Sequence, residues 1–213
     1  MLNLFSNPVF VPLLLVSTGI GLWWLLTSLA VNEKKETLNR FVDKVVYFLV
    51  IAFVGNGFVH FFEIIALPYR ALILSTTAIS ASFLLVLAYS SYRFLKKEKI
   101  EQKIVVAIFQ LVSLLGIINH IYYYFLYKSP LMVGLILLFS GLLLLSSTIP
   151  LGGDSWIIAG GLLGTIFHLL ITRSQSVLYF GFVVTPELLG FIAIEWIVVL
   201  VLLLRRQKQS KRT

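Results

Sequence analysis

Three histidines are the residues of this chain whose type and spacing could do chemistry: His60, His120 and His168. Each lies inside a long apolar segment, where an ionisable side chain is costly and marks a functional site with a partner. Counted along a helix from the charged residue that precedes each segment, they lie roughly 24, 26 and 21 Å from the same membrane boundary. We therefore expect one layer of imidazoles in the outer half of a helix bundle.

Carboxylates are expected to join this layer. His60 and Glu63 are three residues apart, so they share one face of a helix. The last apolar segment supplies one further glutamate: Glu195 if its helix begins at Pro186, or Glu187 if the helix begins earlier. Other polar groups expected near the layer are Asn56, Asn119, Tyr123, Thr165, Arg70 and Arg173.

This set of side chains is compatible with several chemistries. Imidazoles with a carboxylate, in a chain without cysteine, suit zinc, copper or iron rather than magnesium or calcium. Two opposed histidines also suit axial ligation of haem, and a series of His and Glu groups suits a proton relay. The plain alternative is that each histidine lies at the headgroup boundary and binds water. No His-Glu-x-x-His motif is present to decide between them.

The composition assigns the chain to the membrane proteins. It is 59% hydrophobic and 12% charged, whereas a soluble domain averages about 45–50% apolar and about 25% charged residues. Cysteine is absent, which excludes disulfides and thiolate ligands. We expect a multi-pass integral protein, of a prokaryotic plasma membrane.

The basic residues are distributed unevenly along the chain. Of 17 Lys and Arg, all but Arg70, Lys128 and Arg173 lie within 34–44, within 93–103 or after Leu204. Such concentration in alternate connections predicts that the N-terminus is outside and the C-terminus is in the cytoplasm. We expect the basic loops to contact anionic lipid headgroups, and we expect no nucleic-acid partner despite the net charge of +8.

Seven apolar runs are long enough to be considered as spans of a bilayer that needs about 20 residues per helix. They are residues 8–31, 45–67, 71–92, 104–127, 130–148, 155–172 and 178–204. The expected fold is an all-α, seven-helix membrane bundle over 1–204, with a basic tail over 205–213. The first run lacks a basic leader and a cleavage site, so we expect a retained helix rather than a signal peptide.

Two details of this arrangement can be predicted. A histidine occurs in every second run, which suggests one helix followed by three helical hairpins, each led by a histidine-bearing helix. Thr185, Pro186 and Glu187 form the pattern of a helix start, with a capping hydroxyl, a proline in the first turn and an acidic residue beside it. The segment before Thr185 is then expected to lie in the interface or to re-enter the bundle.

The expected function is that of a transporter, sensor or assembly factor, which binds a metal ion, proton or small ligand at the His/Glu layer. Enzymatic activity is not favoured, because the sequence contains no organised nucleophile and base. Two alternatives stay open: an intramembrane metal-dependent hydrolase acting on lipid or peptide at the outer face, and a haem-binding electron carrier.

Overall fold

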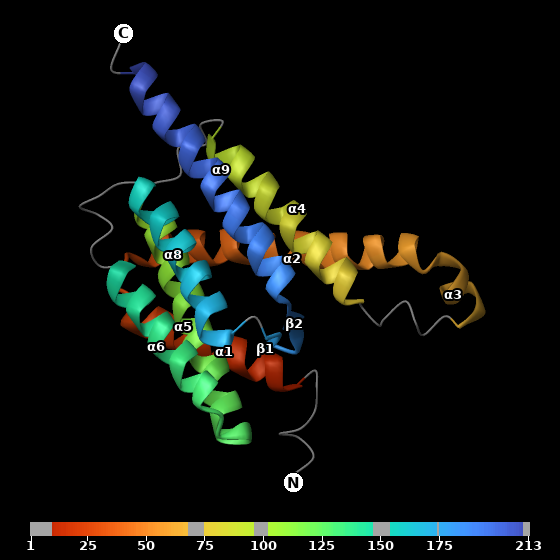
Figure 1. Ribbon diagram of the computed structural model, residues 1–213. Coiled ribbons are helices and arrows are strands. Elements are labelled where there is room, and N and C mark those ends of the chain that lie inside the picture. The colour runs from red at the N-terminus through yellow and green to blue at the C-terminus, as the bar shows by residue number, and fades with distance from the viewer. Residues whose placement is uncertain (1–9, 68–74, 96–101, 147–153, 174, 211–213) are drawn as a thin grey trace. The chain divides into compact units, whose positions relative to one another are not determined.

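The computed structural model describes residues 10–67, 75–95, 102–146, 154–173 and 175–210. These residues are mostly helical, which confirms the all-α class. The helices are α1 Phe10–Leu26, α2 Val31–Val59, α3 Phe61–Ala66, α4 Thr76–Leu95, α5 Gln102–Tyr127, α6 Pro130–Ser146, α8 Asp154–Thr172 and α9 Pro186–Ser210 (Figure 1). Two short strands, β1 Val177–Tyr179 and β2 Phe182–Val184, connect α8 to α9.

The chain divides into two compact units, which are described separately. Unit 1 comprises residues 1–37 and 100–213, and unit 2 comprises residues 38–99. Unit 1 therefore contains α1, α5, α6, α8, the strands and α9, and unit 2 contains most of α2 with α3 and α4.

Two of the described helices are long and apolar enough to cross a membrane: α2 and the Lys103–Tyr127 part of α5. Helices α1 and α6 are apolar but have only 17 residues each. The seven-span bundle expected from the sequence is thus not confirmed among the described helices, although two helices could span a bilayer.

Helix α2 differs from the expected run at both ends. It begins at Val31 rather than near residue 45, because the charged segment that precedes the apolar run is rich in good helix formers. The Glu33 carboxylate accepts a hydrogen bond from the Ala30 backbone N–H at 3.0 Å, the reciprocal half of a capping box. At the other end the helix stops at Val59, and His60 (φ −110°, ψ 25°) separates it from α3.

The segment before Thr185 forms a β-hairpin, Val177–Val184, rather than a helix. Tyr179 pairs with Phe182 across a two-residue turn in which Phe180 and Gly181 both have positive φ, 49° and 86°. Positive φ at both central residues is the mark of a type I′ turn, which matches the twist of the flanking strands.

Helix α9 begins at Pro186, as the Thr-Pro-Glu pattern predicts. The Thr185 hydroxyl accepts a hydrogen bond from the Leu188 backbone N–H at 3.3 Å and so caps the helix. The alternative start near Val177 is wrong, because that residue belongs to β1. At its far end α9 continues to Ser210, so the beginning of the expected tail is helical.

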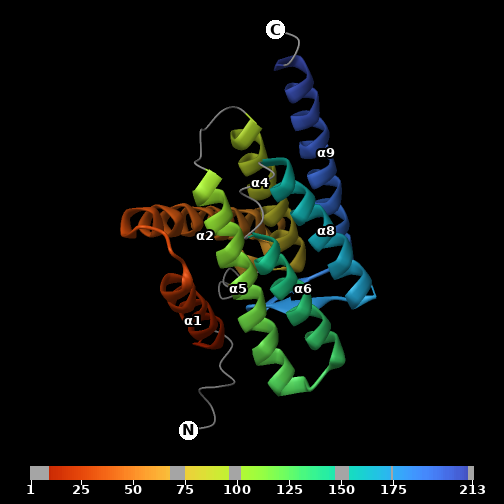
Figure 2. The same ribbon diagram turned by 90° about the vertical axis from the view of Figure 1, so that its left-hand side faces the viewer.

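In unit 1, α5 packs against α1 and α6, and α8 packs against α6 and α9 (Figure 2). Glycines allow this close approach: a Cβ on Gly116 of α5 would lie 2.6 Å from Cδ1 of Phe139 of α6, and one on Gly161 of α8 would lie 2.8 Å from the Trp196 ring of α9. Small residues at helix contacts are typical of bundles in lipid, where packing rather than water exclusion drives association.

In unit 2, α2 and α4 pack with their chains running in opposite directions. The rings of Tyr47 and Tyr89 lie 6.5 Å apart, and those of Phe48 and Phe83 lie 6.4 Å apart. Asn56, nearer the end of α2, accepts a hydrogen bond from the backbone N–H of Ser75 at 3.1 Å, just before α4 begins.

Candidate functional site

His120 is completely buried in unit 1. It lies on α5, one turn after Gly116, where its ring stacks on Phe139 of α6 with 5.6 Å between the ring centroids. The ring of Tyr179, from the hairpin, meets His120 nearly at a right angle with a centroid separation of 4.7 Å. Within the described part of the chain, neither nitrogen of His120 has a hydrogen-bond partner. A buried polar atom without a partner is uncommon and calls for a physical explanation.

His168 approaches the same tyrosine from α8. Only 4% of its surface is exposed, and its Nε2 lies 2.6 Å from the Tyr179 hydroxyl oxygen, a short hydrogen bond whose donor depends on the imidazole tautomer. Its Nδ1 is buried and has no partner among the described residues. Tyr179 therefore contacts both imidazoles, and we call His120, His168, Tyr179 and Phe139 the histidine–tyrosine cluster.

Helix α5 also fixes the hairpin that carries Tyr179. The Asn119 amide donates to the Leu178 carbonyl oxygen at 3.1 Å and accepts from the Phe180 N–H at 2.9 Å. Tyr123, one turn further along α5, forms a hydrogen bond with the backbone of Gly181. These hydrogen bonds hold the turn against α5. They help to stabilise a turn in which Phe180 has a positive φ, a conformation that is unfavourable for a residue with a side chain.

Burial raises the pKa of the Tyr179 hydroxyl well above its usual range. The hydroxyl therefore stays protonated at physiological pH and acts as a neutral hydrogen-bonding group towards His168.

The second predicted pair, His60 and Glu63, belongs to unit 2. Its members do meet, with His60 Nδ1 3.5 Å from Glu63 Oε1, as the spacing predicts. The two side chains are 32% and 52% exposed, so both are much more accessible than the imidazoles of the histidine–tyrosine cluster. Asn56, in contrast, is buried and bonds to the backbone of Ser75.

The remaining predicted site residues occupy varied positions. Glu195 is half-buried on α9, whereas Glu187 is exposed in the first turn of that helix. Arg173 is exposed at the end of α8, and the Thr165 hydroxyl donates to the Gly161 carbonyl oxygen of its own helix at 2.8 Å. Arg70 lies outside the described residues.

The described part of the chain contains no group of three or more His, Asp or Glu side chains placed to hold a metal ion. The histidine–tyrosine cluster provides two buried imidazoles and one phenol hydroxyl. Sequence reasoning missed Tyr179 and Phe139. The available signal was the Phe-Gly pair between two short runs of β-forming residues, Val177–Tyr179 and Phe182–Val184, which indicates a hairpin.

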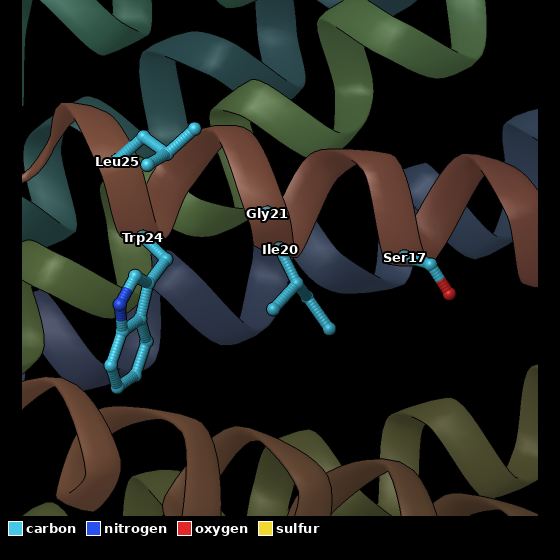
Figure 3. Close-up of a pocket in the computed structure, with 5 residues that line it drawn as sticks. All are labelled: Ser17, Ile20, Gly21, Trp24 and Leu25. Atoms are coloured by element: carbon cyan, nitrogen blue, oxygen red, sulfur yellow. The ribbon is translucent and has the colours of Figure 1, made fainter.

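Unit 1 also has a shallow surface hollow, which is a weaker candidate for a functional site than the histidine–tyrosine cluster. It is lined by Ser17, Ile20, Gly21, Trp24 and Leu25, all from α1 (Figure 3). Its lining contains no titratable side chain, so it offers apolar contact but no acid–base or ligand chemistry.

Comparisons of the chain with protein-family models, with curated proteins and with solved structures found no match.

Proposed function

We propose that this protein is a multi-pass membrane protein that binds a transition-metal ion through His120 and His168, as a transporter, sensor or assembly factor. The proposed arrangement has seven spans, with the N-terminus outside and the C-terminus in the cytoplasm. The distribution of basic residues supports this orientation. Helices of 17 residues, such as α1 and α6, are at the lower limit of the lengths that cross a bilayer, about 17–25 residues.

One observation carries the ligand proposal. Two imidazoles from different helices are buried against one tyrosine ring, and three of their four nitrogens have no partner among the described residues. Neutral imidazole nitrogen is a preferred ligand of zinc, copper and iron. A bound ion would give Nδ1 of His168 and one of the two nitrogens of His120 the partner that the described protein atoms do not provide.

The contact between His168 and Tyr179 supports the same assignment. A metal-binding histidine usually directs its other nitrogen to an outer hydrogen-bonding group, which fixes the orientation of the ring. Here Nε2 of His168 bonds to the Tyr179 hydroxyl at 2.6 Å, which leaves Nδ1 for a ligand. That His60, Glu63 and Glu195 contribute further ligands stays a prediction from the sequence.

The experiment is metal uptake by the full-length protein in detergent. Chelator-treated protein is incubated with Zn²⁺ and separately with Cu⁺, and bound metal is counted by elemental analysis after gel filtration. We expect about one ion per chain. His120→Phe keeps an aromatic ring against Phe139, and His168→Gln keeps a polar group near Tyr179; each should lose most of the bound metal.

His60→Gln is the matched control, because it removes an imidazole from the other unit. Retained uptake in this variant excludes His60 from the site, and lost uptake adds His60 to it. The proposal is wrong if the wild-type protein takes up neither metal, or if His120→Phe and His168→Gln bind as much as the wild type. A Soret band in the purified protein would instead identify a haem carrier.

A further inference from the structure

Unit 2 contains a second group of side chains with a chemistry of its own, at the contact between α2 and α4. The ammonium of Lys44 lies 5.1 Å from the ring centroid of Tyr89 and 6.0 Å from that of Tyr47. From α4, the guanidinium of Arg93 lies 5.8 Å from the Tyr89 ring and donates to the Tyr89 hydroxyl oxygen at 3.0 Å. One tyrosine ring is thus contacted by two cations from two helices.

The charge around this ring is predominantly positive. Arg40 and Arg93 are both close enough to Lys44 to interact with it electrostatically, and Asp43 is the carboxylate that acts on it. Bringing like charges together is unfavourable, more so where part of the solvent is displaced. An anion bound between Lys44 and Arg93 would remove this repulsion.

The donors that these residues present fit a phosphate group. A guanidinium has five N–H donors and an ammonium has three, and arginine in particular matches the geometry of phosphate oxygens. Arg93 donates to the Tyr89 oxygen, whose own O–H can donate outward. The contacts with the tyrosine rings restrain both cations before any ligand binds, which reduces the entropy lost on binding.

The position along the helices indicates which phosphate is available. Lys44 lies in the middle of α2, directly before its apolar part, and Arg93 is in the last turn of α4, so both lie at ends of apolar segments that are expected on the cytoplasmic side. Tyrosines at such ends lie at headgroup depth, and the cytoplasmic leaflet carries the anionic lipids.

We propose that Lys44, Tyr89 and Arg93 form a binding site for the phosphate of an anionic phospholipid headgroup. The proposal rests on the membrane placement under the proposed function, but it does not depend on metal binding at the histidine–tyrosine cluster.

The test measures binding of short-chain dioctanoyl phosphatidylglycerol to the full-length protein in a neutral detergent, by native mass spectrometry and by microscale thermophoresis. Dioctanoyl phosphatidylcholine and inorganic phosphate are titrated in parallel. We expect saturable binding of phosphatidylglycerol and much weaker binding of the other two, because phosphatidylcholine has no net charge and inorganic phosphate has no acyl chains.

Lys44→Gln and Arg93→Gln should each weaken phosphatidylglycerol binding about fivefold, the effect of losing one cation at a lipid surface. Arg93→Lys should recover part of the loss, since it restores the charge without the planar donor fork. Lys35→Gln removes an equal charge from α2 outside this group, and it should leave the Kd within twofold of the wild type. Melting temperatures confirm that each variant is folded.

Equal Kd values for wild type, Lys44→Gln and Arg93→Gln would overturn the site, as would an equal loss in Lys35→Gln, which would show unspecific attraction. If inorganic phosphate binds as tightly as phosphatidylglycerol, the ligand is a free phosphate and the lipid assignment is wrong. Metal uptake should be unchanged in all four variants, so failure at one site is distinguishable from failure at the other.

Discussion

At the scale of single residues, Asn119 connects the candidate site to the rest of unit 1. The Asn119 amide donates to the Leu178 carbonyl oxygen and accepts from the Phe180 N–H, so it gives two backbone groups of the hairpin a partner from α5. Its neighbour in sequence, His120, contacts Tyr179 from the same hairpin. Two successive residues of α5 thus position the tyrosine that bonds to His168.

Asn119→Ala should lower the stability of the protein by about 1–3 kcal/mol, because it leaves a backbone carbonyl and a backbone N–H without their partner. Thermal unfolding in detergent, followed by tryptophan fluorescence, measures the change. Asn119→Asp keeps the acceptor for Phe180 but turns a carboxyl oxygen towards the Leu178 carbonyl oxygen in a fully buried site, so its melting temperature should also fall below that of the wild type. A melting temperature for Asn119→Ala equal to the wild type's would show that these hydrogen bonds contribute nothing.

The Tyr179 hydroxyl should make stability fall at high pH. Its pKa is raised by burial in the folded protein relative to the unfolded chain. The unfolded chain therefore loses this proton first, and the contribution of the neutral hydroxyl is complete below about pH 10 and decreases above it. Melting temperatures measured from pH 8 to pH 11 should fall less steeply for Tyr179→Phe than for the wild type. Parallel curves for the two proteins would contradict the burial of this hydroxyl.

At the scale of elements, the helices were predictable where sequence signals are local. Thr185 before Pro186 correctly marks the start of α9, because capping depends only on adjacent residues. The break at His60 was not predicted, since an apolar run continues on both sides of it and hydropathy alone does not register the turn. The hairpin was missed because Phe180 occupies a position where asparagine or glycine is usual, and the contact that supports it comes from Asn119, 61 residues earlier.

The candidate site shows the same limit. The spacing of His60 and Glu63 correctly predicted their contact, although His60 lies just before α3 rather than on one helix face with Glu63. Sequence reasoning named His120 and His168 as candidates for one site but not Tyr179, the side chain that contacts both. Such a contact depends on how α5, α8 and the hairpin pack, and no periodicity in the sequence encodes it.

The packing of α5 on α6 should depend on Gly116. A Cβ there would come 2.6 Å from the Phe139 ring that stacks on His120. Gly116→Ala should therefore destabilise the protein by about 1–3 kcal/mol through overpacking, and it should weaken metal uptake. Gly141→Ala on α6 is the matched control, because no atom lies within 4 Å of its added Cβ; the better helix propensity of alanine should raise stability by about 0.5–1 kcal/mol. Equal melting temperatures for the two variants would contradict close packing at Gly116.

At the scale of the whole molecule, the number of spans decides where the connections lie. If only α2 and α5 cross the membrane, the chain returns after α5 to the side on which α2 began, and Lys35, Ser129 and Gln175 all lie on that one side. If all seven apolar runs cross, α4 also spans, so Lys35 is in the cytoplasm while Ser129 and Gln175 are outside. The two topologies therefore differ in a way that does not depend on the relative placement of the two units.

The natural chain has no cysteine, so a single introduced thiol can be labelled without background. We expect Ser129→Cys and Gln175→Cys to react with a membrane-impermeant maleimide added to intact cells, and Lys35→Cys to react only after the membrane is permeabilised. Ser129 and Gln175 lie in short connections at the ends of helices, and Gln175 is exposed, so neither thiol should be shielded by packing. Labelling of all three residues from one side would contradict seven spans and agree with two. Labelling of Lys35→Cys alone in intact cells would show that the orientation is opposite to the one that the basic residues predict.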